Sequence, residues 1–347
     1  MTERKSTRSK RPRITSYEVA KAAGVSQPSV SRAFTPGASI TNEKRERILA
    51  AAQELGYVPN VFASSLSRRS SKIVAVISGN LNNPFYSETL QCFVEQIQQT
   101  GRQVLAFTVQ EEQNSDEVMM QALRYPVDGV VVTSASVTST MVKLSEGLGI
   151  PVIMYNRQVP GANIPSVVCD NVAGAGALAR RMHAAGARRF LVLRGDPKGS
   201  TSKARVQGFR ESLDAIAGVE IEEIDGQSSY AGAYRATLAR FDGPSPNWPD
   251  AVFGANDVMA IGCADALRGH FGMSIPEDIM LAGFDGIREG QRAPYRLATV
   301  RQPIERMVTE ALELLDAAKS EEDEASAPLR VIPGDMIPGA TLRMRDT

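Results

Sequence analysis

The sequence predicts an all-α helix-turn-helix headpiece followed by an α/β body that contains two doubly wound parallel sheets. Near the N-terminus, two short helical patterns are joined by only three residues. From residue 72 onward, apolar runs typical of buried parallel strands alternate with helical patterns. The length of 347 residues is enough for two or three domains, so both parts fit in one chain.

The two helical patterns near the N-terminus are YEVAKAA and QPSVSRAF. Thr15 or Ser16 is expected to cap the first helix, and Gly24 to end it. Ser26 is a natural N-cap for the second helix, and Pro28 is tolerated in a first turn. This spacing is typical of a helix-turn-helix, in which the second helix enters the major groove of DNA.

The second helix has an inner and an outer face. Val30 and Phe34 are one helical turn apart and are expected to face inward. Residues on the other face then meet the bases, because Gln pairs with adenine and Arg with guanine in the major groove. The candidate DNA contacts of the headpiece are Ser16, Gln27, Pro28, Ser29 and Arg32.

The first and third predicted helices complete the interior of the headpiece. Thr41 or Asn42 is expected to cap the third helix, and Gly56 to end it. The residues expected to face inward are Val19, Ala22 and Ala23 in the first helix and Ile48, Ala51, Ala52 and Leu55 in the third.

Charge is unevenly distributed along the chain. Residues 1–72 contain 14 Lys and Arg and 5 Asp and Glu, whereas the whole chain contains 39 of each. The first part therefore carries a net charge of +9 and the remainder −9. A basic module on an acidic body favours a nucleic-acid partner for the N-terminal part. The first 13 residues are expected to form a disordered basic arm.

Membrane and secreted proteins are disfavoured by what the sequence lacks. No apolar run approaches the ~20 residues of a membrane span, and the basic N-terminus lacks the apolar segment of a secretion signal. Cys92, Cys169 and Cys263 are scattered and odd in number, as expected for buried thiols in a reducing compartment. We therefore expect a cytoplasmic protein without a membrane partner.

The sequence also lacks the residue patterns of common enzymes and metal sites. His183 and His270 are the only histidines and do not have metal-ligand spacing, and no HExxH, phosphate-loop or GxSxG motif occurs. We expect no enzymatic activity, no metal and no cofactor. An enzyme, or a solute-binding protein for transport, remains an alternative for the α/β body.

Strand and helix patterns alternate through that body. The expected strands are 73–78, 103–109, 128–134, 151–156, 166–170, 188–195, 219–224, 250–257, 278–285 and 297–302. The expected helices are 87–99, 115–124, 172–185, 203–216, 229–240, 258–269 and 303–318. Ligands of such folds lie at the carboxyl ends of the strands or between domains.

Motifs spread over residues 14–345 resemble those of the lactose-repressor-type (LacI/GalR) family of bacterial transcription regulators. These motifs are EVAKAAGVSQPSVSRAF, LGYVPN, NNPFY, RVQGF, AND at 255–257, GFD at 283–285 and TVRQP at 299–303. The resemblance implies a core of two subdomains of periplasmic-binding-protein type, which dimerises and holds a small-molecule effector in its cleft.

The resemblance also implies a division of the chain. Residues 1–13 form the arm, 14–59 the DNA-binding headpiece, 60–71 the hinge helix and linker, and 72–347 the effector-binding and dimerisation core. Within the core, the N-subdomain is expected at about 72–160 plus 300–325, and the C-subdomain at about 165–298 plus 330–345.

In members of this family, the hinge is helical only when it pairs across the dimer on DNA. Leu66 occupies the position of a Leu that wedges into the minor groove, and Ala63 would permit close approach of the symmetry mate. Family members often carry Arg or Gln where this chain has Ser64, which leaves a minor-groove contact there open. The candidate DNA contacts of the hinge are Asn60, Ala63 and Leu66.

The effector contacts implied by the resemblance come from both subdomains. Phe85 and Tyr86 occupy positions of ligand-covering aromatics, and one of the two is expected only to pack beneath the cleft. Arg205 matches an Arg that pairs with ligand hydroxyls or a carboxylate. Asn256 and Asp285 match polar residues that bind vicinal hydroxyls. A crossover contact at Gln302 and three weaker candidates, Asn156, Arg157 and Asp170, complete the set.

The charge of the effector stays open at this point. Arg157 and Lys203 could favour an anionic ligand such as a sugar acid, or they could be solvated loop charges. The resemblance thus implies a cytoplasmic homodimeric transcriptional regulator, more often a repressor in this family. Such a protein binds pseudo-palindromic double-stranded operator DNA with an affinity controlled by a sugar or sugar acid.

Overall fold

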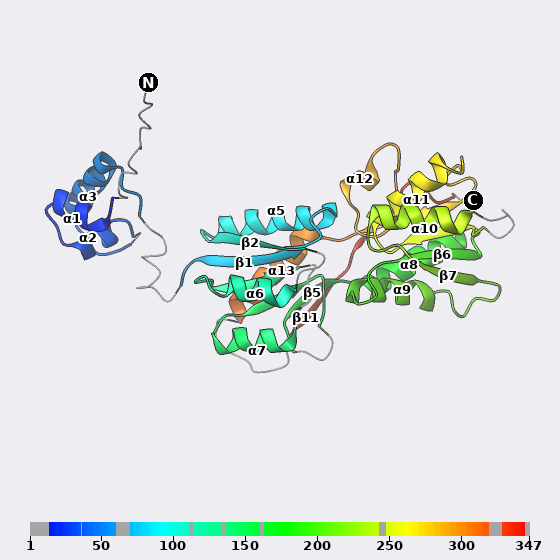
Figure 1. Cartoon of the computed structure of the whole chain (residues 1–347), viewed down its shortest axis with the longest axis horizontal. Helices are drawn as coiled ribbons and strands as arrows, with labels where there is room; N and C mark the ends of the chain where they lie inside the picture. The colour runs from blue at the N-terminus through cyan, green and yellow to red at the C-terminus, as the bar shows by residue number, and fades with distance from the viewer. Residues whose placement is uncertain are drawn as a thin grey trace, which may run out of the picture. The chain divides into compact units, whose positions relative to one another are not determined.

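The computed structural model describes residues 14–35, 37–59, 70–110, 114–133, 137–159, 163–242, 248–318 and 328–343. Contacts divide the chain into two compact units that meet at Ser71 and Lys72. The first unit is helical, whereas the second contains all the strands of the described residues (Figure 1). Each unit has its own apolar core and is described by itself.

The described residues of the first unit form three helices, α1 (Ser16–Ala22), α2 (Gln27–Ala33) and α3 (Asn42–Leu55). Thr15 begins α1, and its backbone N–H and hydroxyl donate to the Glu18 carboxylate at 2.7 and 3.0 Å. The Thr41 hydroxyl caps α3 by accepting from the Lys44 N–H, and Gly56 ends that helix at a φ of 66°. The expected caps at both ends of α3 are thus confirmed.

The core of this unit comprises Val19, Ala20, Ala23, Val30, Ala33, Ile48 and Ala52. The expectation for α1 was wrong at one position, because Ala22 is exposed and Ala20 is buried in its place. The face of α1 that meets α2 and α3 therefore runs through positions i, i+1 and i+4. Phe34 is only half-buried, and its ring lies 5.8 Å from that of Tyr57.

The first lobe of the second unit is built on a six-stranded sheet with the order β11-β5-β4-β3-β1-β2. All neighbouring strands in it are parallel. The strands are β1 (Ile73–Gly79), β2 (Gln103–Val109), β3 (Gly129–Val132), β4 (Val152–Tyr155), β5 (Ser166–Cys169) and β11 (Leu329–Ile332). Four of them, β1, β3, β4 and β5, are buried along their whole length, as their continuous apolar sequences predict.

Helices cover both faces of this sheet (Figure 1). Val74 and Val76 of β1 pack in the same cluster as α5 (Pro84–Gln99) and α13 (Ile304–Ala317). Ala75 and Ile77 point to the opposite face and pack with α6 (Ser115–Ala122) and α7 (Ser139–Gly147). This alternation follows from the two-residue period of a strand.

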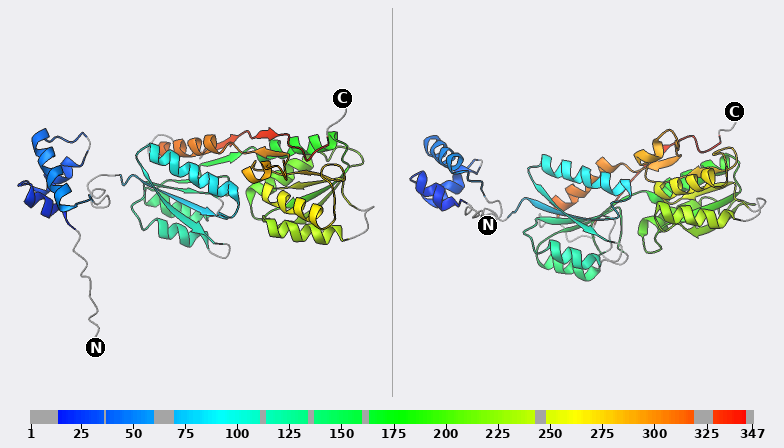
Figure 2. Two further views of the ribbon diagram at one scale, coloured as in Figure 1. Left: turned by 90° about the horizontal axis from the view of Figure 1, so that it is seen from above. Right: turned by 45° about the horizontal axis from the view of Figure 1, so that its top comes forward.

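The second lobe has a four-stranded parallel sheet with the order β7-β6-β8-β9. Its strands are β6 (Arg189–Arg194), β7 (Glu220–Asp225), β8 (Ala251–Gly254) and β9 (Met280–Ala282). Its helices are α8 (Asn171–Ala184), α9 (Ser200–Glu211), α10 (Tyr230–Phe241) and α11 (Asp257–Gly269). Helices α8 and α9 pack against each other on one face, and α10 and α11 on the other (Figures 1 and 2).

The chain passes between the lobes after β5, between β9 and α13, and after β11. On the second and third passes, β10 (Thr299–Arg301) and β12 (Asp335–Ile337) pair antiparallel to form a separate two-stranded sheet. A short helix, α12 (Arg288–Gln291), precedes β10. Helices α7 and α12 were not among the expected elements.

Two expected subdomain boundaries differ from the observed sheets. The sequence placed residues from about 165 onward, and from 330 onward, in the C-subdomain. Instead, β5 pairs with β4, and β11 pairs with β5, so both strands belong to the sheet of the first lobe. A short apolar run does not encode the sheet it joins, because that choice depends on partners distant in sequence.

Candidate functional site

The outer surface of α2 carries the candidate DNA contacts of the headpiece. Pro28 and Arg32 are exposed, whereas Gln27 and Ser29 are half-buried. The Gln27 amide donates to the Ser16 hydroxyl at 3.2 Å, which places α1 and α2 candidates on one continuous surface. The structure therefore brings together all five headpiece candidates, since they lie on α1 and the adjoining face of α2.

The candidate DNA contacts of the hinge, Asn60, Ala63 and Leu66, lie outside the described residues, as does Ser64. Their assignment stays a prediction from sequence.

A polar cavity of about 70 Å³ lies between the two lobes of the second unit. Six of the nine predicted effector contacts line it, namely Tyr86, Asn156, Arg157, Arg205, Asn256 and Asp285. Most of these residues lie where a strand of either lobe ends, which is the usual position of ligands in open α/β sheets.

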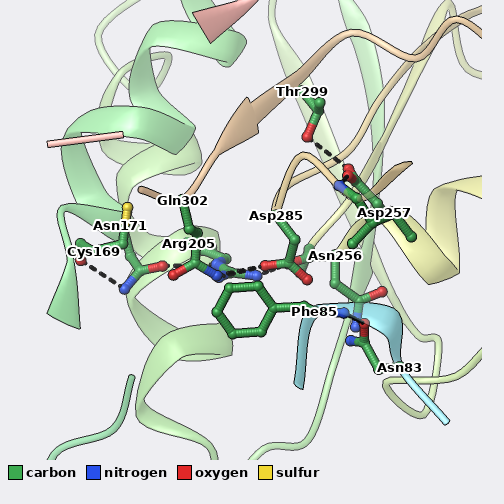
Figure 3. A network of polar contacts seen from close by, with 12 residues as sticks. Asn83, Phe85, Cys169, Asn171, Arg205, Asn256, Asp257, Asp285, Thr299 and Gln302 are labelled. Atoms are coloured by element: carbon green, nitrogen blue, oxygen red, sulfur yellow. Dashed lines mark hydrogen bonds and ion pairs between the residues drawn. The ribbon is translucent and has the colours of Figure 1, made fainter. Parts of the chain in front are cut away.

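Arg205, on α9, is a buried cation with several partners (Figure 3). Its guanidinium donates to the Asn171 side chain at 2.8 Å and to the Ala255 carbonyl at 2.7 Å. It also forms an ion pair with Asp285 at 2.9 Å and lies 3.9 Å above the Phe284 ring. These contacts offset the high cost of burying a charge, and they fix the direction of the guanidinium.

Asp285 is the anionic partner, and it follows β9 in the GFD motif. Burial raises the pKa of its carboxyl, while the charge of Arg205 and the Gln302 amide, which donates at 2.7 Å, counteract that rise. The side chain of Asn83, from the first lobe, also interacts with this carboxylate. Asp285 has a φ of 125°, a conformation rare outside glycine, so the surrounding bonds hold its backbone in place.

Asn156 and Arg157 follow β4 at the edge of the first lobe. Asn156 is 2 % exposed and has a φ of 56°, and its side-chain oxygen has no hydrogen-bond partner among the described residues. The Arg157 guanidinium lies 4.0 Å from the Asp196 carboxylate across the cavity. Burial raises the pKa of the neighbouring Tyr86 hydroxyl, and the charge of Arg157 opposes that rise.

Asn256 begins α11, and its side-chain oxygen accepts from the Met259 N–H at 2.8 Å. Its oxygen is therefore committed to the helix cap, while its amide group faces the cavity edge near the Ser228 carbonyl. The next residue, Asp257, is fully buried and accepts from the Thr299 hydroxyl at 2.6 Å and the Ile287 N–H at 2.9 Å. Burial, aided by the Asp285 charge, raises the pKa of Asp257 to about 7.

Three predicted contacts, Phe85, Gln302 and Asp170, do not line this cavity. Phe85 is 1 % exposed and packs edge-on against Tyr86, so it is the aromatic that lies beneath the cleft. Adjacent residues on α5 point about 100° apart, so only one of them reaches the cavity. Gln302 instead supports the cavity wall, because it holds the Asp285 carboxylate.

Three residues considered at the sequence level, Asp170, Lys198 and Lys203, lie outside the cavity lining. Asp170 caps α8 by accepting from the Ala173 N–H at 3.0 Å and does not line the cavity. Lys203 and Lys198 are exposed and do not line it either.

Six polar lining residues were not predicted. Two of them, Thr201 and Ser202, lie on α9, and the other four are Asn80, Asn83, Asp196 and Ser228. These other four follow the end of β1, β6 or β7, so the strand-end rule that identified Asn156 and Asp285 would also have identified them.

Among the described residues, no group of three or more His, Cys, Asp and Glu side chains is placed to hold a metal ion. Within the same described part of the chain, no helix has the length and apolarity required to cross a membrane.

The fold and the site together define a helix-turn-helix unit joined to a two-lobed ligand-binding unit. Two family models agree with this division. Bacterial regulatory proteins of the lacI family match residues 15–60, and a periplasmic binding protein-like domain matches residues 179–342.

Relatives match over nearly the whole chain. The Ribose operon repressor of Halalkalibacterium halodurans is 31 % identical over 294 residues, which cover 83 % of this chain and 85 % of that protein. The HTH-type transcriptional regulator GntR of Pseudomonas aeruginosa is 30 % identical, covering 90 % of this chain and 92 % of that protein. The chain belongs to the lacI family of bacterial regulatory proteins.

Solved structures show the same architecture. The lac repressor dimer bound to operator and an anti-inducer has a TM-score of 0.84 at 21 % identity, and the match covers 95 % of this chain and 99 % of that one. A transcriptional regulator CelR–cellobiose complex has a TM-score of 0.69 at 27 % identity, covering 95 % and 100 % of the two chains.

Proposed function

We propose that this protein is a homodimeric transcriptional regulator, acting as a repressor, whose affinity for operator DNA is controlled by a sugar or sugar acid bound between its lobes. The observation that supports this most is the polar cavity, in which six residues predicted from sequence converge. Operator DNA, a dimer and a carbohydrate ligand occur in the names of its structural neighbours, which favours the same partners here.

The cavity has the chemistry of a carbohydrate site. Amide groups of Asn83 and Asn256 and the fixed Arg205–Asp285 pair supply donors and acceptors at several points of its wall. Vicinal hydroxyls are recognised by such groups, since each hydroxyl both donates and accepts. Tyr86 supplies an aromatic edge of the same cavity.

The size of the cavity supports control by a ligand. About 70 Å³ is well below the roughly 300 Å³ at which small-molecule sites begin. A sugar-sized ligand therefore requires the walls of the cavity to rearrange. A ligand that binds one position of the lobes better than another shifts the equilibrium between these conformations.

The proposal is tested on the full chain in two steps. The protein first selects DNA from a random duplex pool, and we expect recovered sites with two inverted half-sites, as two headpieces require. Sugars and sugar acids are then screened for a change in affinity for the selected DNA. Recovery of no preferred sequence would contradict DNA-specific regulation, and no change with any compound would contradict control by a carbohydrate.

A further inference from the structure

Asp257 joins two walls of the cavity between the lobes without lining that cavity itself. The inference rests on the proposed function, because it concerns how the same cavity selects its ligand. Asn256 and Asp285 both line the cavity, whereas Asp257 does not. Asp257 follows Asn256 at the start of α11, and its carboxyl is bonded to β10 and to the loop after β9 (Figure 3).

The loop that carries Asp285 is attached to β10 through the backbone. The Gly283 N–H donates to the Ala298 carbonyl at 2.9 Å. The Asp285 N–H donates to the Val300 carbonyl at the same distance, and the Asp285 carbonyl accepts from the Gln302 N–H at 3.1 Å. These bonds fix Asp285 relative to β10, but they do not fix it relative to Asn256, which lies on α11.

Asp257 supplies the connection to α11. Its side chain is fully buried, and one carboxylate oxygen accepts from the Thr299 hydroxyl of β10 at 2.6 Å. The other oxygen accepts from the Ile287 N–H of the loop at 2.9 Å. The Asp257 N–H donates to the Phe284 carbonyl of the same loop at 2.7 Å. Three bonds from one residue thus join the start of α11 to both segments that hold Asp285.

The loop has little room to shift away from this carboxyl. A Cβ added at Gly283 would lie 2.2 Å from an Asp257 carboxylate oxygen, so the backbone of the loop passes directly against it. The φ of 125° at Asp285 is rare outside glycine and persists only where the surrounding structure enforces it. A change at Asp257 is therefore expected to alter the position of Asp285.

The spacing between Asn256 and Asp285 matters for a ligand that carries several hydroxyls. The hydroxyls of a sugar have fixed relative positions, and these positions differ between epimers. Polar groups that bind two hydroxyls at once must be held to within about 0.5 Å, which requires residues behind the site that lock them in place. Among the bonds of the described residues, those of Asp257 meet this requirement for the Asn256 and Asp285 walls.

We propose that Asp257 is a positioning residue that determines the specificity of the cavity among sugars. It sets the distance between the Asn256 amide and the Asp285 carboxylate. That distance selects the arrangement of hydroxyls that both groups bind at once.

The experiment is calorimetric titration of the full chain with epimeric probes, namely D-glucose, D-galactose and D-mannose, and D-gluconate and D-galactonate. Asp257→Ala should lower the affinity for the tightest-binding probe at least tenfold and its preference over its epimer at least threefold. Asp257→Asn should retain that preference, since its amide can bond to the same loop and strand. A variant that only lowers the folded fraction weakens both epimers by one common factor and leaves the preference unchanged.

Asp265→Ala is the matched control. Asp265 lies on the same helix, accepts from the Tyr230 and Tyr295 hydroxyls at 2.8 and 3.1 Å, and does not line the cavity. Its replacement removes a carboxylate with two hydrogen bonds, so it should lower the melting temperature of the protein. The preference between epimers should stay at its wild-type value.

A second measurement needs no ligand. Hydrogen exchange of the full chain reports how firmly the amides of residues 283–287 are held. These amides should exchange faster in Asp257→Ala than in Asp265→Ala, because only the former variant loses side-chain bonds between the loop and α11.

The outcomes separate this inference from the proposed function. An Asp257→Ala variant that keeps the wild-type preference between epimers overturns the role in specificity, and unchanged exchange at residues 283–287 overturns the positioning role. If no probe binds the wild-type protein, the proposed ligand class falls, whereas exchange still decides whether Asp257 holds the loop. Loss of folding in Asp257→Ala is recognised from its melting temperature. Thr299→Val then removes only the bond to β10, and it should lower the preference between epimers in the same direction.

Discussion

At the scale of single residues, the site depends on charges that are buried and compensated. Arg205 and Asp285 are each at most 5 % exposed and sit 2.9 Å apart. Removing one partner of such a pair leaves the other charge buried without compensation, which is costly. Replacing both partners by apolar groups removes that cost. We therefore expect the stability of the core and the binding of the proposed effector to depend on this pair in different ways.

Asp285→Ala should destabilise the core by roughly 3–5 kcal/mol, because it leaves Arg205 uncompensated. The double variant Asp285→Leu with Arg205→Met should recover much of that loss, yet neither protein should bind the effector. Urea unfolding followed by circular dichroism measures the first quantity, and calorimetric titration the second. Equal destabilisation in single and double variants would show that the pair is not the cause.

Asp257 makes stability depend on pH. The pKa of about 7 exceeds the ordinary value of 3.8, so the folded protein binds this proton more tightly than the unfolded chain does. The stabilisation that Asp257 contributes is therefore complete below about pH 4 and is lost as the pH rises through 7. The contribution of Asp257 decreases by about 1.4 kcal/mol per pH unit between the two pKa values, less near 7.

Asp257→Asn should flatten this dependence. An Asn can accept from the Ile287 N–H, as Asp257 does, and its amide can replace the hydrogen bond with the Thr299 hydroxyl with the donor and acceptor exchanged. The urea midpoints of the variant at pH 6 and pH 8 should converge. The gain in free energy of unfolding over the wild type should be about 1 kcal/mol larger at pH 8 than at pH 6. A variant that loses stability equally at both pH values would indicate that Asp257 is charged in the fold.

Several of these residues were predictable from sequence, and others were not. Asn156, Arg205, Asn256 and Asp285 were identified because each sits in a recognisable motif or at a strand end. Phe85 and Tyr86 are adjacent, and only the phase of α5 decides that Tyr86 reaches the cavity. That phase is set by packing against β1 and α13, which local sequence does not reveal.

At the scale of elements, the first two helices present the surface that we predict to read DNA. Arg32 is exposed on α2, and Gln27 is linked to Ser16 of α1, so the helices share one polar face. The caps and the turn between these helices were predictable because they depend on neighbouring residues. The assignment of Ala22 to the interior was not, because Ala20 and Ala22 are equally apolar and the position of α3 selects between them.

Arg32→Ala should reduce affinity for the selected DNA by roughly 1–3 kcal/mol with little effect on random DNA. Arg47→Ala is the matched control, since it makes the same change on the exposed face of α3. It should leave the preference for selected over random DNA unchanged. Both affinities are measured by fluorescence anisotropy at one salt concentration, because phosphate contacts depend on salt. Equal losses of Arg32→Ala on both DNAs would show that Arg32 contacts only phosphate.

At the scale of the whole second unit, the lobes are held together around a small cavity. The Gln158 N–H donates to the Ser200 hydroxyl at 3.0 Å, and Arg288 lies 3.4 Å from Glu88, so contacts cross between the lobes on separate segments. A ligand larger than the present cavity has to rearrange these contacts. The fold class was predictable from alternating strands and helices, whereas the lobe boundaries at β5 and β11 depended on long-range pairing.

The central claim is that a ligand between the lobes controls DNA binding, and linkage tests it most directly. The affinity of the full chain for its selected DNA is measured with and without the tightest-binding sugar or sugar acid, and the affinity for that ligand is measured with and without DNA. The factor by which the ligand changes the affinity for DNA must equal the factor by which DNA changes the affinity for the ligand. We expect this factor to be roughly 5- to 150-fold. If saturating ligand leaves DNA affinity unchanged, the cavity does not control the headpiece and the account is contradicted.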